Sequence, residues 1–205
     1  MSDVIPTRSA LIECKEERHA LYEGHVFLDE MCLLLAGEIV AELRRSAALE
    51  ADFLPACKRA TAALVAATGR HGLEELLVYP VPEREPASAE IIPRSLVGVR
   101  LLEAHLHLTQ PAQPQQAVNA SPEARDCRAA FADVIEMAAP LAAVSGNLER
   151  LYLAYRRALR RARALQDVLL PELDRTVYAL EAGLEDLERE DAIAMRLKTA
   201  SAGIR

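Results

Sequence analysis

Apolar residues recur at alternating steps of three and four in the second half of the chain, and this spacing constrains the fold most. It runs without exception from Val134 to Leu169, breaks, and resumes one residue late from Leu173 to Leu187. Residues at these steps share one face of a helix, in the pattern of the a and d positions of a coiled coil. The spacing predicts a long C-terminal helix, with an irregularity beside Pro171 where the register shifts.

The first part of the chain carries the same spacing. It begins at Leu11 and continues to Ile39, with two polar members, Arg18 and His25. Thr7 is placed to cap the start of this helix. His25 is interpreted as a polar layer that fixes the register of the packed helices, or as a tolerated histidine at the edge of the seam, and a role as proton relay is less favoured.

Beyond this point we expect the first helix to become irregular. The apolar spacing is expected to drift through Leu43, Ala47 and Leu54. Pro55 removes a backbone donor and predicts a kink or a break, and Pro140 predicts another in the second helix. The helix is expected to resume over 56–67 and to end at Gly69 and Gly72.

The middle of the chain differs from both flanks. Seven of the 11 prolines lie between Pro80 and Pro122. Short runs at 76–79, 91–92 and 96–101 have β-forming composition and predict a short β-hairpin. The predicted fold is all-α, a long antiparallel two-helix coiled coil with a small Pro-rich head. Its parts are an N-terminal helix over 1–71, a central head with hairpin and linker over 72–123, and a C-terminal helix over 124–205.

Composition excludes several classes of protein. The net charge of −7 argues against a broad nucleic-acid surface. We find no apolar run of the ~18 residues that a membrane span needs, and no secretory signal, so a cytoplasmic chain without membrane insertion is expected. The four cysteines lie far apart and are interpreted as free thiols.

The search for catalytic and metal motifs gives weak candidates only. The chain has no phosphate-binding loop and only three lysines. Glu16 and His19 form one ExxH pair, whereas a di-iron bundle needs two. His105 and His107 alternate on a possible strand and are interpreted as solvent-facing. We therefore predict no catalytic residue, no cofactor and no metal ligand.

Five arginines crowd one stretch of the predicted second helix. They are Arg156, Arg157, Arg160, Arg161 and Arg163. In an antiparallel pair this stretch would lie near Glu42, Glu50 and Asp52, which favours cross-helix ion pairing. A docking patch for a partner protein is the alternative interpretation.

Three segments together carry a resemblance to one family. They are Ile5-Pro6-Thr7-Arg8-Ser9-Ala10-Leu11 with Gly24-His25, then Ser95-Leu96-Val97-Gly98-Val99-Arg100, and finally Arg161 to Gln166 with Leu170-Pro171-Glu172-Leu173 and Leu184 to Glu190. In order and spacing they resemble the D subunit of the V/A-type rotary ATPases, and the resemblance spans nearly the whole chain.

The resemblance implies a non-catalytic rotor shaft in the central stalk of an ATPase or ATP synthase. The implied partners are the F subunit, the catalytic A and B subunits, and the protein that caps the membrane rotor ring. Torque would pass between the catalytic hexamer and that ring, in proton or sodium transport. The complex would be peripheral to the membrane on its cytoplasmic side.

Candidate interface residues follow from this implied role. The tip inside the catalytic hexamer is predicted to consist of weakly polar residues from both ends of the chain, namely Val4, Ile5, Ile193, Met195 and Leu197. Arg157 and Arg161 are predicted on the side that meets the F subunit. Two other classes remain open, a cytosolic coiled-coil adaptor and a metal-binding helical bundle enzyme.

Overall fold

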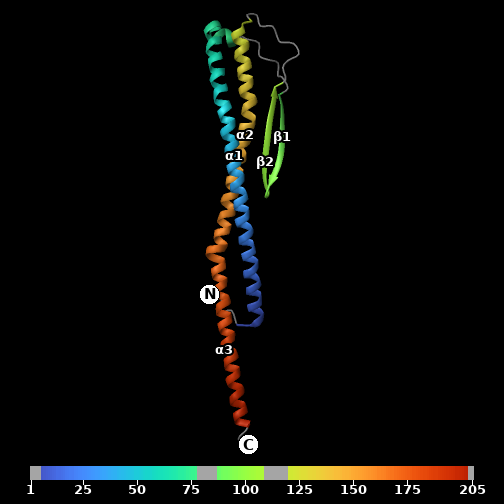
Figure 1. Ribbon diagram of the computed structural model, residues 1–205, viewed down its shortest axis with the longest axis vertical. Coiled ribbons are helices and arrows are strands. Elements are labelled where there is room, and N and C mark those ends of the chain that lie inside the picture. The colour runs from blue at the N-terminus through green and yellow to red at the C-terminus, as the bar shows by residue number, and fades with distance from the viewer. Residues whose placement is uncertain (1–5, 78–86, 109–119, 203–205) are drawn as a thin grey trace. The chain divides into compact units, whose positions relative to one another are not determined.

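The computed structural model describes residues 6–77, 87–108 and 120–202, and side chains as far as Lys198. The elements, in chain order, are helix α1 (Arg8–Leu77), strands β1 (Ala87–Leu96) and β2 (Val99–Leu108), helix α2 (Pro122–Ala164), a π-helical turn η1 (Leu165–Leu169) and helix α3 (Leu170–Ala202) (Figure 1). The predicted long helices at both ends of the chain and the small antiparallel sheet between them are confirmed.

The chain divides into two compact units. Unit 1 comprises Met1–Leu33 and Arg156–Arg205, and unit 2 comprises Leu34–Tyr155. Unit 1 therefore joins the two ends of the chain, whereas unit 2 is one continuous stretch of sequence.

Unit 1 begins at the predicted cap of α1. The Ala10 amide donates to Oγ1 of Thr7 at 3.2 Å, and the Leu11 amide donates to the Thr7 carbonyl at 3.0 Å. Thr7 thus satisfies amides that the first turn of a helix leaves unpaired. Pro6 lies against α3, since a Cβ on Gly183 would come within 3.0 Å of the Pro6 Cβ.

The first part of α1 and helix α3 run in opposite directions in unit 1. Three ion pairs show this, because their α1 members ascend in the sequence while their α3 members descend. The pairs are Arg8–Glu188 at 2.8 Å, Lys15–Glu181 at 2.7 Å and Arg18–Asp174 at 3.3 Å. All three are exposed, so each contributes at most about 1 kcal/mol, and they specify register more than stability.

The apolar contribution to unit 1 comes from the predicted spacing. Ala158, Ala162, Val177 and Leu180 are buried at their expected positions, whereas Leu169 and Leu187 are exposed. Arg18, the polar member nearest the start of α1, is also exposed.

The irregularity expected beside Pro171 is the π-turn η1. The Leu170 amide donates to the carbonyl of Leu165, five residues back. One extra residue is thereby accommodated between the half-buried Leu165 and Leu170, and the spacing continues in phase from Leu173. Pro171 has no backbone N–H and cannot donate the hydrogen bond of a regular α-helix. The π-turn lies directly before it, where a departure from regular α-helical bonding therefore costs less.

In unit 2, the spacing on α1 differs from the prediction. Buried positions continue from Leu35 through Glu42, Ser46, Ala56 and Ala60 to Ala67. Half-buried residues at 39, 49, 53 and 63 stand between them, so the spacing keeps to steps of three and four. The predicted drift through Leu43, Ala47 and Leu54 is wrong, because all three are exposed. The buried face was expected to consist of apolar residues, but the polar residues Glu42 and Ser46 occupy it.

A break at Pro55 is wrong, whereas the departure from helical geometry at Gly72 agrees with the predicted end of the first helix. Neither Pro55 in α1 nor Pro140 in α2 interrupts its helix. The backbone leaves helical geometry at Gly72, with φ of 72°, and α1 then continues to Leu77. Leu76 and Leu77, expected in a β-forming run, are therefore helical, and residues 78–79 of that run lie outside the described part of the chain.

The two strands form an antiparallel hairpin in unit 2. Ala87 pairs with Leu108 at the open end and Leu96 with Val99 at the turn. Val97 and Gly98 both have positive φ, 47° and 79°, as a two-residue turn with the twist of a hairpin requires. The hairpin extends over ten residues per strand, longer than the short one predicted.

By length and composition alone, one helical stretch, Pro122–Lys198, includes an 18-residue window apolar enough to cross a membrane, with mean hydropathy of 1.3. This criterion admits up to two charged residues in the window, so it differs from the uninterrupted apolar run that the sequence was searched for.

Candidate functional site: the docked hairpin and the exposed interface residues

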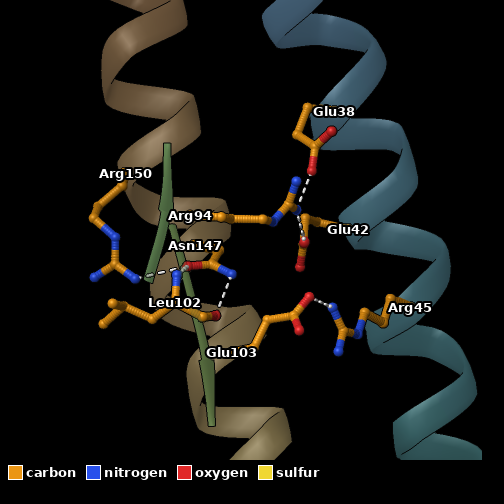
Figure 2. Close-up of polar contacts among 8 residues, drawn as sticks. All are labelled: Glu38, Glu42, Arg45, Arg94, Leu102, Glu103, Asn147 and Arg150. Carbon is orange, nitrogen blue, oxygen red and sulfur yellow. Dashed lines mark hydrogen bonds and ion pairs between the residues drawn. The ribbon is translucent and has the colours of Figure 1, made fainter. Parts of the chain in front are cut away.

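Asn147 of α2 fixes the outer edge of β2. Its Oδ1 accepts a hydrogen bond from the Leu102 amide, and its Nδ2 donates to the Leu102 carbonyl, both at 2.8 Å (Figure 2). Arg150 donates to the same Oδ1 at 2.8 Å. Asn147 is fully buried, so its amide takes the place that a neighbouring strand would otherwise occupy.

A second residue of α2 extends this contact along the strand. Oε1 of Glu136 accepts a hydrogen bond from the Leu108 amide at 2.9 Å. Both backbone groups of Leu102 point away from β1 and bond to Asn147. Leu102 and its cross-strand partner Pro93 therefore form a pair that exchanges no backbone hydrogen bonds. The missing amide of Pro93 therefore costs no ladder bond, as is usual on an edge strand.

Helix α1 holds the hairpin through Arg94 of β1. Nη2 of Arg94 donates to Oε1 of Glu38 and, at 2.8 Å, to Oε1 of Glu42. The Glu42 side chain is only 3% exposed, and a carboxylate at that depth needs a cation because removal from water disfavours its charge. Hydrogen bonding to Glu38 is the main cause that raises the pKa of Arg94 above its usual value.

Arg45 and Glu103 form the second bridge between α1 and the hairpin. Nη1 of Arg45 donates to Oε1 of Glu103 at 3.0 Å (Figure 2). This hydrogen bond and the positive charge of Arg45 lower the pKa of Glu103. Leu101, on the same strand, is fully buried. The hairpin is thus held by one deep apolar side chain and a set of polar bridges to two helices.

The end of α1 meets the start of α2 through His71. Its Nε2 lies 2.6 Å from Oγ of Ser121, and its Nδ1 lies 3.3 Å from Oε2 of Glu75. The same Ser121 Oγ accepts a hydrogen bond from the Ala124 amide at 3.1 Å and caps α2. Arg70 and Glu123 approach within 3.5 Å beside it. These contacts hold the last part of α1 against the first turn of α2.

The predicted interface residues on the second flank are exposed. Ile193, Met195 and Leu197 lie near the end of α3 and are 57%, 69% and 67% exposed. Arg157 and Arg161 are exposed on α2. Val4 and Ile5 lie outside the described residues.

Two of the acidic residues that were expected near the arginine stretch have contacts of their own. Glu42 is bound by Arg94, and Oε1 of Glu50 accepts a hydrogen bond from Ser46 at 2.9 Å. Both contacts lie within unit 2.

The histidines interpreted as ordinary residues have ordinary contacts. His19 lies 3.3 Å from Glu23 and His25 lies 3.5 Å from Asp29, each one helical turn away. His105 and His107 lie in β2 and are exposed. Within residues 6–77, 87–108 and 120–198, no three His, Cys, Asp or Glu side chains are grouped so as to hold a metal ion.

The hairpin bridges were missed at the sequence level. Asn147 and Arg94 each stand inside an apolar stretch. A polar residue in such a place was the one sign in the sequence that it has a buried partner. The contacts themselves join residues 28–58 positions apart, and no periodicity connects them.

Comparisons with known proteins agree over nearly the whole chain. Residues 10–201 match the family model for the ATP synthase D subunit. The chain is 23% identical over 193 residues to the D subunit of the V-type ATP synthase of Thermotoga neapolitana, covering 94% of this chain and 95% of that protein. It is 27% identical over 199 residues to the D subunit of the A-type ATP synthase of Pyrococcus furiosus, covering 94% and 92%. It is 29% identical over 200 residues to the A-type D subunit of Desulfurococcus sp., covering 95% and 92%. The match of the family model to residues 10–201 shows that the chain belongs to the ATP synthase D subunit family.

Proposed function

We propose that this chain is the central-stalk D subunit of a V/A-type ATPase or ATP synthase and transmits torque between the catalytic A/B hexamer and the membrane rotor ring. The observation that carries the proposal is the family match over residues 10–201. Members of this family are stalk proteins and not catalytic ones. The F subunit and the protein that caps the rotor ring are the other proposed partners, and the transported ion is a proton or sodium.

The packing in unit 1 supports a mechanical role. Three ion pairs cross between α1 and α3, at Arg8, Lys15 and Arg18. Between them lies a seam that buries Val177 and Leu180. Sliding or twisting one helix against the other would break these contacts together, so a two-helix element carries torque better than a single helix. We propose that the paired helices form an antiparallel coiled coil.

The tip of the proposed shaft is weakly polar. Exposed apolar side chains without fixed charge suit a bearing, because few specific ion pairs would have to break during rotation. We propose Ile193, Met195 and Leu197, with Val4 and Ile5, as the residues that turn inside the catalytic hexamer.

The tip is tested by the double variant Ile193→Glu/Met195→Glu in the assembled complex. Two charges in the bearing are expected to impair assembly or to uncouple ATP hydrolysis from ion transport. Tyr178→Glu is the matched control, because Tyr178 is an exposed large side chain of α3 outside the proposed tip. Unchanged ATPase activity and coupling in the double variant would refute the tip assignment.

The proposed side for the F subunit is tested by Arg157→Glu/Arg161→Glu. Affinity for the F subunit, measured by titration calorimetry, is expected to fall at least tenfold, since the two residues lie one turn apart on α2 and share a face. Arg163→Glu/Arg175→Glu carries the same charge change elsewhere. Wild-type affinity in the first variant would remove these residues from the interface.

The location and the domain division are part of the proposal. We propose a cytoplasmic complex peripheral to the membrane, with the parts 1–71, 72–123 and 124–205, no nucleic-acid partner and no membrane insertion of Pro122–Lys198. Val144 and Leu151 of that stretch are buried within the protein. Alkaline extraction of membranes tests this, because a peripheral protein is released and a spanning helix is retained.

A further inference from the structure

The β-hairpin of unit 2 is joined to the rest of the chain at one end only. The chain enters it at Ala87 and leaves it at Leu108, which pair with each other at the open end. The turn end, at Leu96 and Val99, lies ten residues along each strand (Figure 1). The position of the turn end therefore depends on side-chain contacts, and these contacts decide whether the hairpin stays docked.

Little apolar surface holds the hairpin in place. Of the residues in its two strands, only Leu101 is buried. Ile91 and Ile92, the two isoleucines of β1, are exposed. By contrast, Leu35 of α1 and Leu151 of α2 are completely buried. Since burial of apolar area supplies most of the resistance to opening, the hairpin is expected to open before the helices do.

The polar contacts that dock the hairpin are incompletely satisfied. Oε2 of Glu42, Nε of Arg94 and Nε of Arg150 are buried, and none of the three atoms has a hydrogen-bond partner within the described residues. Buried polar groups without partners disfavour the state that buries them. Release of the hairpin would return Arg94 and Glu42 to water, so the docked position is less stable than its set of ion pairs suggests.

One guanidinium, that of Arg94, neutralises two carboxylates of α1. Its Nη2 donates to both Glu38 and Glu42, which lie one helical turn apart (Figure 2). Without this cation the two like charges would repel each other, and the buried Glu42 would be left without a partner for its charge. Undocking removes the conflict because Glu42 then regains water. Docking is thus coupled to the charge balance at this one site.

The ion pairs of the hairpin are open to solvent. The side chains of Arg45 and Glu103, which form the second bridge, are partly exposed, and so is Arg94. Dissolved salt screens ion pairs that solvent reaches, whereas it does not screen apolar contacts. Ionic strength is therefore expected to shift the hairpin and to leave the helices in place.

From these observations we propose that the hairpin is a releasable strap, held against α1 and α2 by a charge latch that consists of Arg94, Glu38 and Glu42. The strap opens at its turn end while the helices stay folded. A cation that binds Glu38 and Glu42 in place of Arg94 releases it. The inference goes beyond the proposed function, because it concerns a conformational change of the chain by itself.

Residue-resolved hydrogen exchange of the full chain tests the strap. The amides of Leu102 and Leu108 report docking, because they donate to side chains of α2 and not to β1. Their protection factors are expected to be at least about tenfold lower than those of the Leu35 and Leu151 amides in the helices. In about 1 M NaCl they are expected to fall further while the helix amides keep theirs. Equal protection of strand and helix amides would overturn the proposal.

Two variants test the charge latch. Arg94→Gln is expected to lower the protection of Leu102 at least about tenfold, because Glu42 is left buried without a cation. Adding Glu42→Gln is expected to restore most of that protection, since no buried charge then lacks a partner. The matched control is Arg100→Gln, which removes one positive charge from an exposed position of β2 and is expected to leave Leu102 as protected as in wild type.

The variants also separate the latch from a general loss of structure. Wild-type protection of Leu102 in Arg94→Gln would overturn the proposal, and so would a double variant no better protected than the single one. Loss of protection at Leu151 in Arg94→Gln would overturn it as well, because the hairpin and the helices would then open together as one unit.

Discussion

At the scale of single residues, Asn147 makes the contact of the hairpin that is hardest to replace. Its amide serves both backbone groups of Leu102, and Arg150 binds the same oxygen. A small side chain at this position would leave a buried amide and carbonyl without partners.

Asn147→Ala is therefore expected to lower the free energy of unfolding by about 2–3 kcal/mol, and to speed amide exchange at Leu102. Urea denaturation and hydrogen exchange measure the two effects. Ser145→Ala, at a nearby exposed position of the same helix, is the control. A loss below about 0.5 kcal/mol, the range of ordinary surface substitutions, would contradict the role assigned to Asn147.

Glu103 makes the docking of the hairpin depend on pH. Because Arg45 lowers its pKa in the folded state, the ion pair contributes stability above the ordinary carboxyl pKa of 4.5, and the contribution is lost as the pH falls through the lowered value. The stability difference between wild type and Glu103→Gln is thus expected at neutral pH and should vanish in acid. A difference that persists unchanged in strong acid would contradict this assignment.

At the scale of elements, the features that depend on the local spacing of apolar residues could be predicted from the sequence. The seam of the second flank and the irregularity near Pro171 both follow from local spacing. The route of α1 beyond Ile39 did not, because Glu42 is buried only through its pairing with Arg94, a residue 52 positions away. The hairpin was predicted from composition, but its bridges to both helices depend on contacts that only the folded chain brings together.

The π-turn η1 is interpreted as a one-residue insertion that the seam absorbs. Deleting Val168, which is exposed, together with Pro171→Ala should convert η1 to regular α-helix and keep Leu165 and Leu173 on the buried face. Stability by urea denaturation is expected within about 1 kcal/mol of wild type.

The control deletion is Arg160, which is exposed in the regular part of α2. Removing one residue there rotates the following seam by about 100° and should cost several kcal/mol, since buried apolar side chains would turn outward. Equal losses from the two deletions would contradict this interpretation of η1.

At the scale of the whole molecule, the family and the geometry support different conclusions. Membership in the ATP synthase D subunit family rests on residues 10–201, whereas the geometry supports the proposal that the chain transmits torque. Unit 1 pairs α1 and α3 through a buried seam with ion pairs along it. Unit 2 adds a hairpin that polar bridges hold to α1 and α2.

The most direct test of the stalk role is single-molecule observation of the purified complex. The catalytic A and B subunits are fixed to a surface, and a probe is attached to this chain at an exposed position such as Arg100 replaced by cysteine. On addition of ATP, the probe is expected to rotate continuously in one direction, at a rate that follows hydrolysis. A probe that stays still while the complex hydrolyses ATP at its normal rate would contradict the stalk role.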